Sequence, residues 1–444
     1  MARKRGSTEP KPEARGITRL GVENFKSISG RIELDIKPLT ILSGRNSSGK
    51  SSFMQPLLLL KQTLEAPFDP GSLRLSGPNV DFSKVEQMRP KGCVVKNEEI
   101  SISVFVNTDE SISFSFGSSE GDPIYTSRMS VRGKASVNIS AGDSAEDLER
   151  FIEFTAIGPD GEEVECTYRV ARERCFLSIE WDDGDGWVKY PTHAFWGIDE
   201  FSDAVLDVIH IPGLRGNPAR HYSISAAWGK FPGLFNDYVA SLIDGMKRSE
   251  PYLLESIGAD LCRLGLTWKV DANRVDDTKV EVRVARLPSP LDGGAVDMVS
   301  IADVGFGVSQ TLPVVVALRI AKPGQLVYIE QPELHLHPKA QVELAKLLVA
   351  AAKRGVRVVT ETHSNLLILG VQSAIAESEI PPSDVALYWF SRDDQTGATR
   401  VTPAEIDENG AFGDWPADFA DVEMNAQAHY MDLVERNLAR GRRT

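Results

Sequence analysis

The stretch from Gly44 to Ser52, GRNSSGKSS, has the residue types and the spacing of a phosphate-binding loop. It fits the pattern G-x-x-x-x-G-K-[ST] at every position. Glycines let the backbone wrap around a phosphate, and the N–H groups that open the following helix point at its oxygens. Lys50 would bring a positive charge to the phosphates, and the Ser51 hydroxyl would bind Mg²⁺. A Gly- and Ser-rich turn without a ligand is the alternative, but the apolar strand before the loop and the apolar helix after it favour a nucleotide site.

A carboxylate ends the apolar run LVYIE, residues 326–330. Ligands of parallel sheets bind at the carboxyl ends of the strands. We therefore expect Glu330 to hold Mg²⁺ through water, and the simpler alternative is a strand that happens to end in Glu. A third run, VRVVTETHS, places His363 at the same edge, where it would suit a sensor of the γ-phosphate. A lone histidine is more often structural.

The elements that must position these residues follow from the hydrophobic pattern. Helices and strands alternate in the last third of the chain, which predicts βαβ units and a parallel sheet. Near the N-terminus, paired strands precede a strand that enters the loop, and Pro56 is expected to bend the next helix or end its first part. The fold class is thus α/β, with one sheet formed by both ends of the chain. The expected elements are strands 17–36 and 38–43, helix 51–66, helix 308–321, strand 326–330, helix 338–353, strand 356–360, helix 365–377 and strand 386–390.

The middle of the chain has a different character. Short alternating runs separated by turn residues predict an antiparallel β-rich insertion, and a mixed helical and strand segment follows it. The expected division is a flexible tail at 1–15, the N-terminal part of the head at 16–95, the insertion at 96–194, the mixed segment at 195–290, and the C-terminal part of the head at 291–444.

Composition narrows the functional classes. The net charge of -14 argues against a chain whose whole surface binds nucleic acid, so we expect such binding only through a complex. The four cysteines form no CxxC pair and indicate reduced thiols of an intracellular protein. No apolar run approaches the roughly 18 residues of a membrane span, so the sequence predicts a cytoplasmic protein that makes no membrane contact.

These motifs together resemble those of ABC-class ATPase heads. The segments GRNSSGKSS, DVGFGVSQTLPVV, IEQPELHLHPKAQ and TETHSN have the order and spacing of the bacterial AAA-family, OLD-like ATPases, which are relatives of RecF and SMC heads. The group includes ATPase subunits of antiphage defence systems such as Septu and PARIS. The segments GVENFKSI, IHIPGLRGNPARHY and GDWPADFAD are also similar to one such branch.

The resemblance implies ATP and Mg²⁺ as ligands, and it implies a role for each matching residue. Glu330 would be the Walker B carboxylate, residues 335–338 the D-loop and His363 the switch histidine. Residues 307–310 would be the signature, in which Gly307, Ser309 and Gln310 contact the nucleotide of a second copy, so the implied assembly is a homodimer that encloses ATP and could extend to a higher oligomer. Gln87 in KVEQM matches the Q-loop and would join Ser51 and Glu330 at the metal. The Walker A loop would comprise Gly44, Arg45, Asn46, Ser47, Ser48, Gly49, Lys50, Ser51 and Ser52.

The chain departs from the family at the catalytic pair. Gln331 stands where the general base is usual, and an amide can position water but accepts a proton poorly. Glu333 is the expected replacement; otherwise it caps the helix near Pro338 or pairs with an arginine. His335 and His337 fit the D-loop better than a metal site, because the sequence offers no third ligand nearby.

We therefore expect an ATP-binding, slowly hydrolysing switch that controls a partner nuclease or toxin. The alternatives are an ATP-bound scaffold without turnover and a RecF-like DNA-repair ATPase. We expect no nuclease site in the chain itself, because its DxD motif, Asp183 and Asp185, falls in a predicted hairpin turn.

Overall fold

The computed structural model describes residues 16–91, 99–107, 110–118, 123–133, 136–151, 166–182, 187–189, 197–225, 229–287, 289–290, 294–413 and 428–434. The expected tail, the DxD motif and most of GDWPADFAD lie outside these residues. Among the described residues, no helix combines the length and the apolar character needed to cross a membrane.

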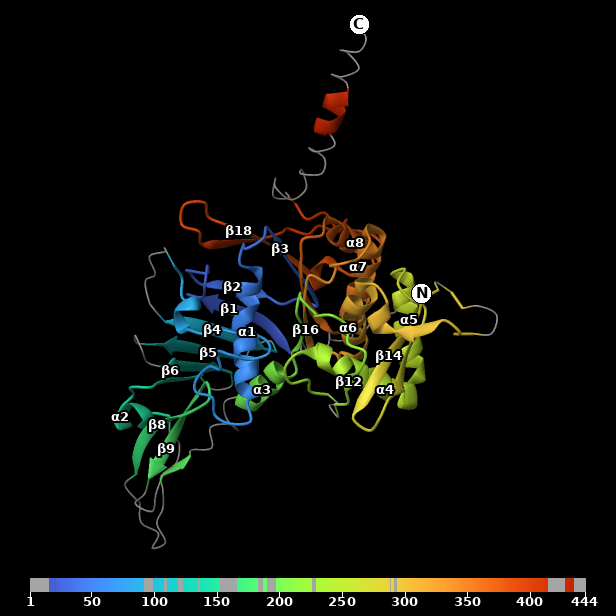
Figure 1. The fold of residues 1–444 in the computed structure, drawn as a ribbon. Helices are drawn as coiled ribbons and strands as arrows, with labels where there is room; N and C mark the ends of the chain where they lie inside the picture. The colour runs from blue at the N-terminus through green and yellow to red at the C-terminus, as the bar shows by residue number, and fades with distance from the viewer. Residues whose placement is uncertain are drawn as a thin grey trace, which may run out of the picture.

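A six-stranded sheet, the central sheet, joins the two ends of the chain (Figure 1). Its first five strands are parallel and the last is antiparallel to its neighbour. The sequence-based expectation of one α/β sheet built from both ends is confirmed. In spatial order the strands are β11 (Ile209–Ile211), β16 (Leu326–Glu330), β17 (Arg357–Thr362), β3 (Leu39–Gly44), β18 (Val385–Arg392) and β19 (Thr399–Pro403).

The register of the central sheet aligns the residues of the motifs at one edge. Glu361 of β17 is paired with Leu42 of β3 on one side and with Glu330 of β16 on the other. Successive side chains of a strand face opposite sides of a sheet. Glu361 and Thr362 therefore present their side chains on opposite faces, next to the start of the phosphate loop.

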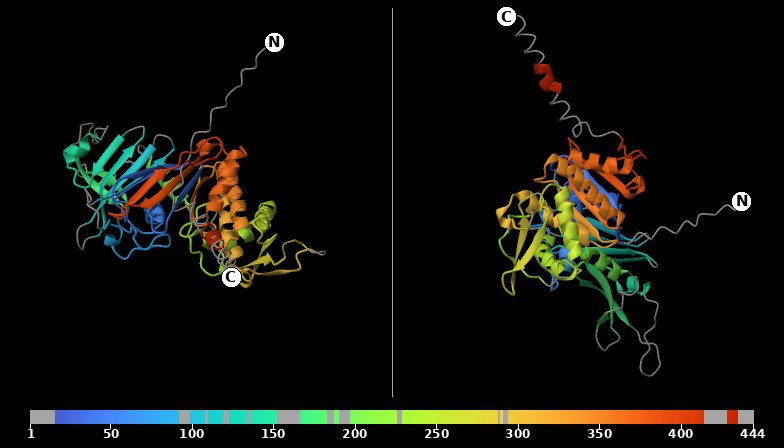
Figure 2. Two further views of the ribbon diagram at one scale, coloured as in Figure 1. Left: turned by 90° about the horizontal axis from the view of Figure 1, so that it is seen from above. Right: turned by 90° about the vertical axis from the view of Figure 1, so that its right-hand side faces the viewer.

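One face of the central sheet is covered by helices from the C-terminal part of the chain. They share a core with the apolar residues Ile41, Val327, Ile329 and Val358. Two of them, α7 and α8, run side by side in both views of Figure 2. Two of these helices, α6 (Phe306–Ile320) and α7 (Pro338–Lys353), contact strands of the central sheet. Helix α8 (Asn365–Ala376) packs on α7, and the helices of the mixed segment, α4 (Val239–Ser249) and α5 (Pro251–Arg263), pack on α6.

The other face of the central sheet packs against α1 (Lys50–Leu64), which shares a second core with Leu42, Tyr328 and Val359. The helix continues through Pro56, so the expectation that this proline ends its first part is wrong. Proline removes one backbone hydrogen bond, and burial of the α1 residues from Phe53 to Leu64 compensates for that loss.

A second six-stranded sheet, entirely antiparallel, lies beyond α1. Because β1 pairs with β4 in this sheet, the domain boundary expected at residue 95 falls inside one structural unit. The strand order is β2 (Ile32–Asp35), β1 (Ile17–Glu23), β4 (Ile100–Val106), β5 (Glu110–Gly117), β6 (Tyr125–Arg132) and β7 (Ser136–Ser140).

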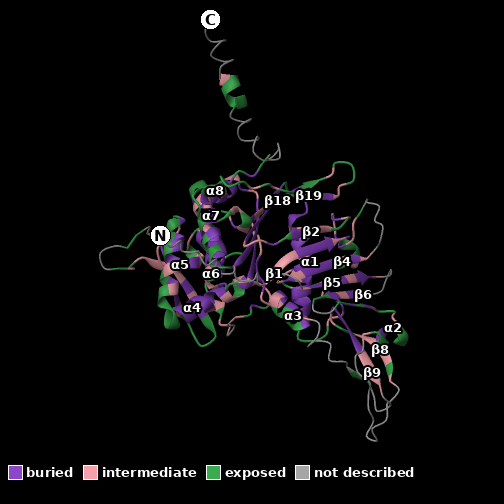
Figure 3. Cartoon of the chain, turned by 180° about the vertical axis from the view of Figure 1, so that it is seen from behind, coloured by how far each residue is buried: buried purple, intermediate pink, exposed green. Residues whose placement is uncertain are grey.

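Two smaller sheets extend from this body. The outlying pair β8–β9 and helix α2 are more exposed than the central sheet (Figure 3). The mixed segment is not separate from the head either, because it contributes β11 to the central sheet. The remaining elements are α2 (Ala145–Glu149), β8 (Thr167–Glu173), β9 (Phe176–Asp182), β10 (Val188–Lys189), α3 (Ile198–Leu206), β12 (Tyr222–Ser223), β13 (Val270–Arg274), β14 (Lys279–Ala285), β15 (Met298–Ser300), and the 3₁₀ turns η1 (Val85–Gln87), η2 (Phe235–Tyr238), η3 (Ile301–Asp303) and η4 (Pro382–Asp384).

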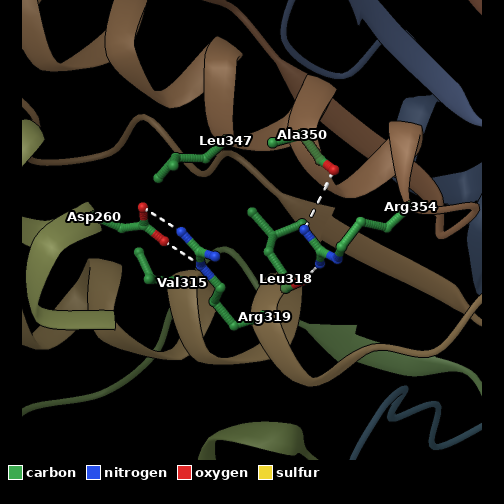
Figure 4. A pocket seen from close by; sticks show the side chains of 7 residues that line it. All are labelled: Asp260, Val315, Leu318, Arg319, Leu347, Ala350 and Arg354. Atoms are coloured by element: carbon green, nitrogen blue, oxygen red, sulfur yellow. Dashed lines mark hydrogen bonds and ion pairs between the residues drawn. The ribbon is translucent and has the colours of Figure 1, made fainter. Parts of the chain in front are cut away.

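A small pocket lies between α5, α6 and α7, away from the phosphate loop (Figure 4). Asp260 of α5 is fully buried there and pairs with Arg319 of α6, whose Nη2 atom lies 2.6 Å from Asp260 Oδ1. Arg354 donates to the backbone carbonyls of Ala350 and Leu318 from the end of α7. These bonds tie the three helices together, so the pocket has a structural explanation.

Candidate functional site

The phosphate loop has a backbone that only glycine can adopt at two positions. Gly44 has a φ of 139°, and a Cβ atom there would lie 2.0 Å from the carbonyl oxygen of Phe390 in β18. Gly49 has a φ of 107°, and its Cβ would lie 2.3 Å from Thr399 Oγ1 in β19. Thr399 also donates to the Ser48 carbonyl at 2.9 Å. The last two strands of the sheet therefore fix the shape of a loop that is more than 300 residues away in sequence.

The start of α1 provides the anion-binding groups expected from the motif. Gly49 caps the helix without a side-chain hydrogen bond, so N–H groups of the first turn remain available to a ligand. Arg45, Asn46 and Ser47 are exposed at the tip of the loop, and Ser52 is partly exposed in the first turn of the helix.

Lys50 lies under the loop with only 4% of its surface exposed. Its ammonium group donates to the carbonyls of Gly44 at 3.0 Å and Arg45 at 2.9 Å. Burial lowers the pKa of Lys50, and the charges of Glu361 and Glu333 oppose that shift. The cation is thus held at the loop between two carboxylates.

The side chain that contacts Ser51 is Glu361, which the motif analysis did not identify. Ser51 Oγ donates to Glu361 Oε2 at 2.7 Å, and the Tyr328 hydroxyl donates to Glu361 Oε1. Glu361 is 2% exposed. Burial raises its pKa to about 7, with a further contribution from the charge of Glu330. An acidic residue inside the apolar run VRVVTET was the only sequence signal for this contact.

Glu330 lies at the same edge of the central sheet, but its hydrogen-bond partners come from β11 and the residues that follow it. Its carboxylate contacts His210 Nε2 at 3.2 Å and accepts from the Gly213 N–H at 3.1 Å. Burial raises the pKa of Glu330, but these hydrogen bonds outweigh burial and leave it lowered. His210 in turn contacts Asn79 Oδ1 at 3.0 Å. Its role was not foreseen, because β11 has three residues and gives a weak sequence pattern.

Glu333 approaches from the opposite face of the sheet. Its Oε1 atom accepts from Thr362 Oγ1 at 2.7 Å and from the His363 N–H at 2.9 Å. Its Oε2 atom is buried and has no hydrogen-bond partner among the described residues. Burial raises the pKa of Glu333. Glu333 is not the cap of α7, because His337 fills that position by accepting from the Lys339 N–H.

Gln331 and His363 complete the edge of the sheet. Gln331 has a φ of 44°, in the left-handed region, and its N–H donates to the Glu361 carbonyl at 2.9 Å. His363 lies beside the Gly44 backbone and Lys50, and partial burial together with the lysine charge lowers its pKa. His363 therefore lies next to the phosphate loop, and its role as a sensor stays a prediction.

Arg215 is a second residue that the motif analysis did not assign. Its guanidinium donates to the carbonyls of Gln310 at 3.1 Å and Glu330 at 2.8 Å. Burial lowers its pKa to about 10, and the charges of Glu333 and Glu330 oppose the shift. The arginine thereby connects the helix expected to carry the signature with the turn that follows β16.

The residues expected to form the signature lie at the start of α6, whose N-cap residue, Gly305, makes no side-chain hydrogen bond. Gly307 packs near Leu266 and the His335 carbonyl, and Ser309 Oγ donates to the Phe306 carbonyl at 3.2 Å. The Gln310 side chain is buried, and its expected contact with the nucleotide of a second copy stays a prediction. Its amide donates to the Gly216 carbonyl at 2.7 Å.

Gln87 lies apart from this group. Its side-chain oxygen accepts from the N–H groups of Ser83 and Lys84, at 2.9 and 3.4 Å, within its own turn. The oxygen that would bind a metal is therefore used in hydrogen bonds within the turn. The described contacts give Gln87 a local structural role. The His335 ring lies 5.8 Å from the Phe306 ring, which places the expected D-loop against the start of α6.

The arrangement fits a nucleotide with Mg²⁺. Ser48 Oγ and Glu333 Oε2 are buried without hydrogen-bond partners among the described residues, and such atoms normally have one. Mg²⁺ prefers oxygen ligands and retains water, so it would bind Ser51, phosphate oxygens and water, with carboxylates around them. Within the described part of the chain, no group of three His, Cys, Asp or Glu side chains has the geometry of a metal site.

Comparison with known families identifies three segments. Residues 16–162 match the family described as AAA ATPase domain, and residues 292–369 match one described as AAA domain, putative AbiEii toxin, Type IV TA system. Residues 380–426 match a family of proteins of unknown function, DUF3696. No curated protein matches the chain. The two ATPase matches contain the phosphate loop and the 330–363 edge, and they support a nucleotide-binding ATPase.

The solved structures that the comparison matches to this chain include SMC head domains. The SMC head bound to the C-terminal winged-helix domain of ScpA is 13% identical, with a TM-score of 0.46 over 88% of this chain and 98% of that chain. The SMC head domain from Thermotoga maritima is 10% identical, with a TM-score of 0.37 over 88% and 100%. An SMC head from Pyrococcus furiosus, with an extended coiled coil and bound to the C-terminal domain of ScpA, is 10% identical, with a TM-score of 0.41 over 87% and 96%.

Proposed function

We propose that this chain is an ATP-binding, slowly hydrolysing switch of the ABC class, the ATPase subunit of a bacterial antiphage complex that controls a partner nuclease or toxin. The AAA matches support nucleotide binding and ATPase chemistry. The defence role rests on the resemblance of the sequence motifs to ATPase subunits of such systems.

The proposal of ATP hydrolysis rests on the Oε2 atom of Glu333, which is buried and has no hydrogen-bond partner among the described residues. Thr362 and the His363 N–H hold the other oxygen, so the carboxylate has one fixed and one available acceptor. In the proposed step, water attacks the γ-phosphorus while Glu333 takes a proton from that water. The bond from phosphorus to the β,γ-bridging oxygen breaks, and ADP and phosphate are formed.

The protein groups around this step have separate tasks. Lys50 and the N–H groups of α1 neutralise and orient the phosphates, and His363 contacts the γ-phosphate from the neighbouring strand. Mg²⁺, when bound, offsets charge on the phosphate oxygens. Gln331 supplies no proton acceptor, so the proposed step depends on Glu333 for that role.

The proposed assembly is a homodimer that encloses two nucleotides. Phe306, at the start of α6, is 50% exposed, and the helix start beside it has no side-chain cap. The Ser309 hydroxyl is hydrogen-bonded within its own helix, to the Phe306 carbonyl. A second copy would bring its α6 start to the phosphate loop of the first, where uncapped N–H groups favour an anion.

Phosphate release from labelled ATP tests the proposal. The Glu333→Gln variant should bind ATP with unchanged affinity, lose phosphate release and accumulate as an ATP-bound dimer in light scattering. The matched control is Glu379→Gln, a surface glutamate paired with Lys353, which should retain full turnover.

Two results would contradict hydrolysis at this site. Undiminished phosphate release by Glu333→Gln would exclude Glu333 as the base. Intact ATP that stays bound to the unaltered chain, without turnover in the presence of any co-expressed partner, would favour the scaffold suggested by Gln331. Control of an effector would be supported if co-expression with a neighbouring nuclease or toxin gene yields a complex whose toxicity changes in Glu333→Gln.

A further inference from the structure

Ser51 and Glu330 are the pair that the motifs assign to magnesium, yet their side chains are not hydrogen-bonded partners in the structure. The Ser51 hydroxyl donates to Glu361 at 2.7 Å. Glu330 is occupied by His210 and by the Gly213 N–H. The carboxylate nearest to the loop hydroxyl thus comes from the strand beside β3, one strand closer than β16.

We propose that Glu361 positions Ser51 as a magnesium ligand, a role separate from the water-mediated contact with Mg²⁺ that the sequence motifs assign to Glu330. This inference rests on the proposed function, because it concerns the metal that accompanies ATP. A hydroxyl has one proton to donate and two lone pairs. When Glu361 accepts the proton, the lone pairs of Ser51 Oγ are directed away from the carboxylate and can bind a cation.

Three contacts hold Glu361 in place for this task. The Tyr328 hydroxyl donates to its second oxygen, and the backbone of Glu361 is paired on both sides within the central sheet. The carbonyl of Glu361 accepts the Gln331 N–H at 2.9 Å. A buried carboxylate fixed in this way cannot rotate to find another partner, so the orientation of Ser51 is fixed as well.

Tyr328 also connects the two carboxylates. Its hydroxyl donates to Glu361, the charge of Glu330 acts on it as well, and its ring stacks on His210 with a centroid distance of 5.3 Å. The polar groups form a row from Ser51 through Glu361, Tyr328 and Glu330 to His210. Glu330 consequently lies toward the far end of this row from Ser51, where His210 and the Gly213 N–H hold its carboxylate.

Nucleotide binding with and without metal tests this assignment. Dissociation constants for ATP would be measured in Mg²⁺ and in EDTA for the unaltered chain, Glu361→Gln and Glu330→Gln. We expect Glu361→Gln to retain its affinity for ATP in EDTA. Its affinity for the metal should fall about 10- to 100-fold, the usual effect of removing a residue that hydrogen-bonds to a metal ligand. We expect a smaller loss of metal affinity for Glu330→Gln than for Glu361→Gln. Binding of Mn²⁺ with ADP, followed by electron paramagnetic resonance, gives the metal affinity directly.

Glu361→Asp serves as a second variant in case Glu361→Gln does not fold. It keeps an acid at the buried position but withdraws the carboxylate from Ser51 by one methylene, so the same loss of metal affinity is expected. The affinity for ATP in EDTA reports whether each variant is folded.

The outcomes separate this inference from the proposed function. Unchanged metal affinity in both Glu361 variants, with a large loss in Glu330→Gln, would overturn the role of Glu361 and leave the ATPase proposal intact. Failure of the unaltered chain to bind ATP in either condition would overturn both.

Discussion

The hydroxyl of Thr362 lies 2.7 Å from the Oε1 atom of Glu333 and donates a hydrogen bond to it. This bond joins the end of β17 to the turn after β16, and it fixes a carboxylate whose other oxygen has no partner among the described residues. Thr362 is the residue next to Glu361, so the end of β17 holds Glu333 on one face of the sheet and presents Glu361 to Ser51 on the other.

Thr362→Val should reduce kcat for ATP by about 10- to 100-fold, because a misplaced base loses much of its contribution to the transition state. The affinity for ATP should change little, since Thr362 makes no described contact with the phosphate loop through its hydroxyl. Thr362→Ser restores the donor and should recover most of the rate. Thr360→Val is the matched control, because the Thr360 hydroxyl lies on the same face of the strand and is buried without a hydrogen-bond partner among the described residues. A kcat equal to that of the unaltered chain in Thr362→Val would show that Glu333 needs no orientation from β17.

Gly44→Ala should destabilise the protein and abolish ATP binding. The new Cβ would meet the Phe390 carbonyl at 2.0 Å in a backbone conformation that only glycine adopts freely. We expect a loss of at least about 2 kcal/mol in the free energy of unfolding, measured with denaturant. In Gly30→Ala, the control, the new methyl group would meet no atom within 4 Å. Normal ATP affinity in Gly44→Ala would contradict the close approach of β18 to the loop.

Arg215→Lys should weaken both stability and turnover. Lysine carries a charge but cannot match the fork of donors that reaches the carbonyls of Gln310 and Glu330, so buried acceptors lose their partners. The expected loss in the free energy of unfolding is about 2–4 kcal/mol. Arg220→Lys changes an exposed arginine that pairs with Asp303, and it should have little effect. Equal stability of the two variants would mean that the connection between α6 and β16 is dispensable.

Gln331→Glu should not restore activity to Glu333→Gln. The Gln331 Oε1 atom lies 3.8 Å from the position that a Cβ of Gly213 would take, so its side chain extends toward the β11 side and Glu330. A carboxylate there would face Glu330. It would not take the place of the Glu333 carboxylate, which Thr362 orients. Phosphate release by the double variant is the measurement, and recovery of the rate of the unaltered chain would assign the base to position 331.

The sequence allowed some elements to be predicted to the residue and others not at all. Strand 326–330 and helix 338–353 have the bounds expected, because an unbroken apolar run and a helical period are local signals. The pairing of β1 with β4 is not a local signal, since about eighty residues separate the strands, and the boundary at residue 95 was misplaced for that reason.

The candidate site shows the same division. The loop and Glu330 follow from motifs, because their chemistry requires residues at fixed spacing. The contact of Glu361 with the loop depends on which strand lies beside β3. The position of Arg215 depends on the three-residue strand β11, which precedes it in the chain. Strand order and the choice of hydrogen-bond partners arise from tertiary packing, which periodicity does not encode.

The pairing of β3 has a consequence for how the protein is made on the ribosome. Residues 39–44 are hydrogen-bonded to β17 and β18, whose residues are translated more than 300 positions later. A nascent chain would therefore carry a phosphate loop without its neighbours for most of its synthesis, while β1, β2 and β4–β7 already have all their partners. Ligand-binding competence would be acquired abruptly near the end of translation, so a truncated product would hold an ordered antiparallel sheet but could not take up a nucleotide.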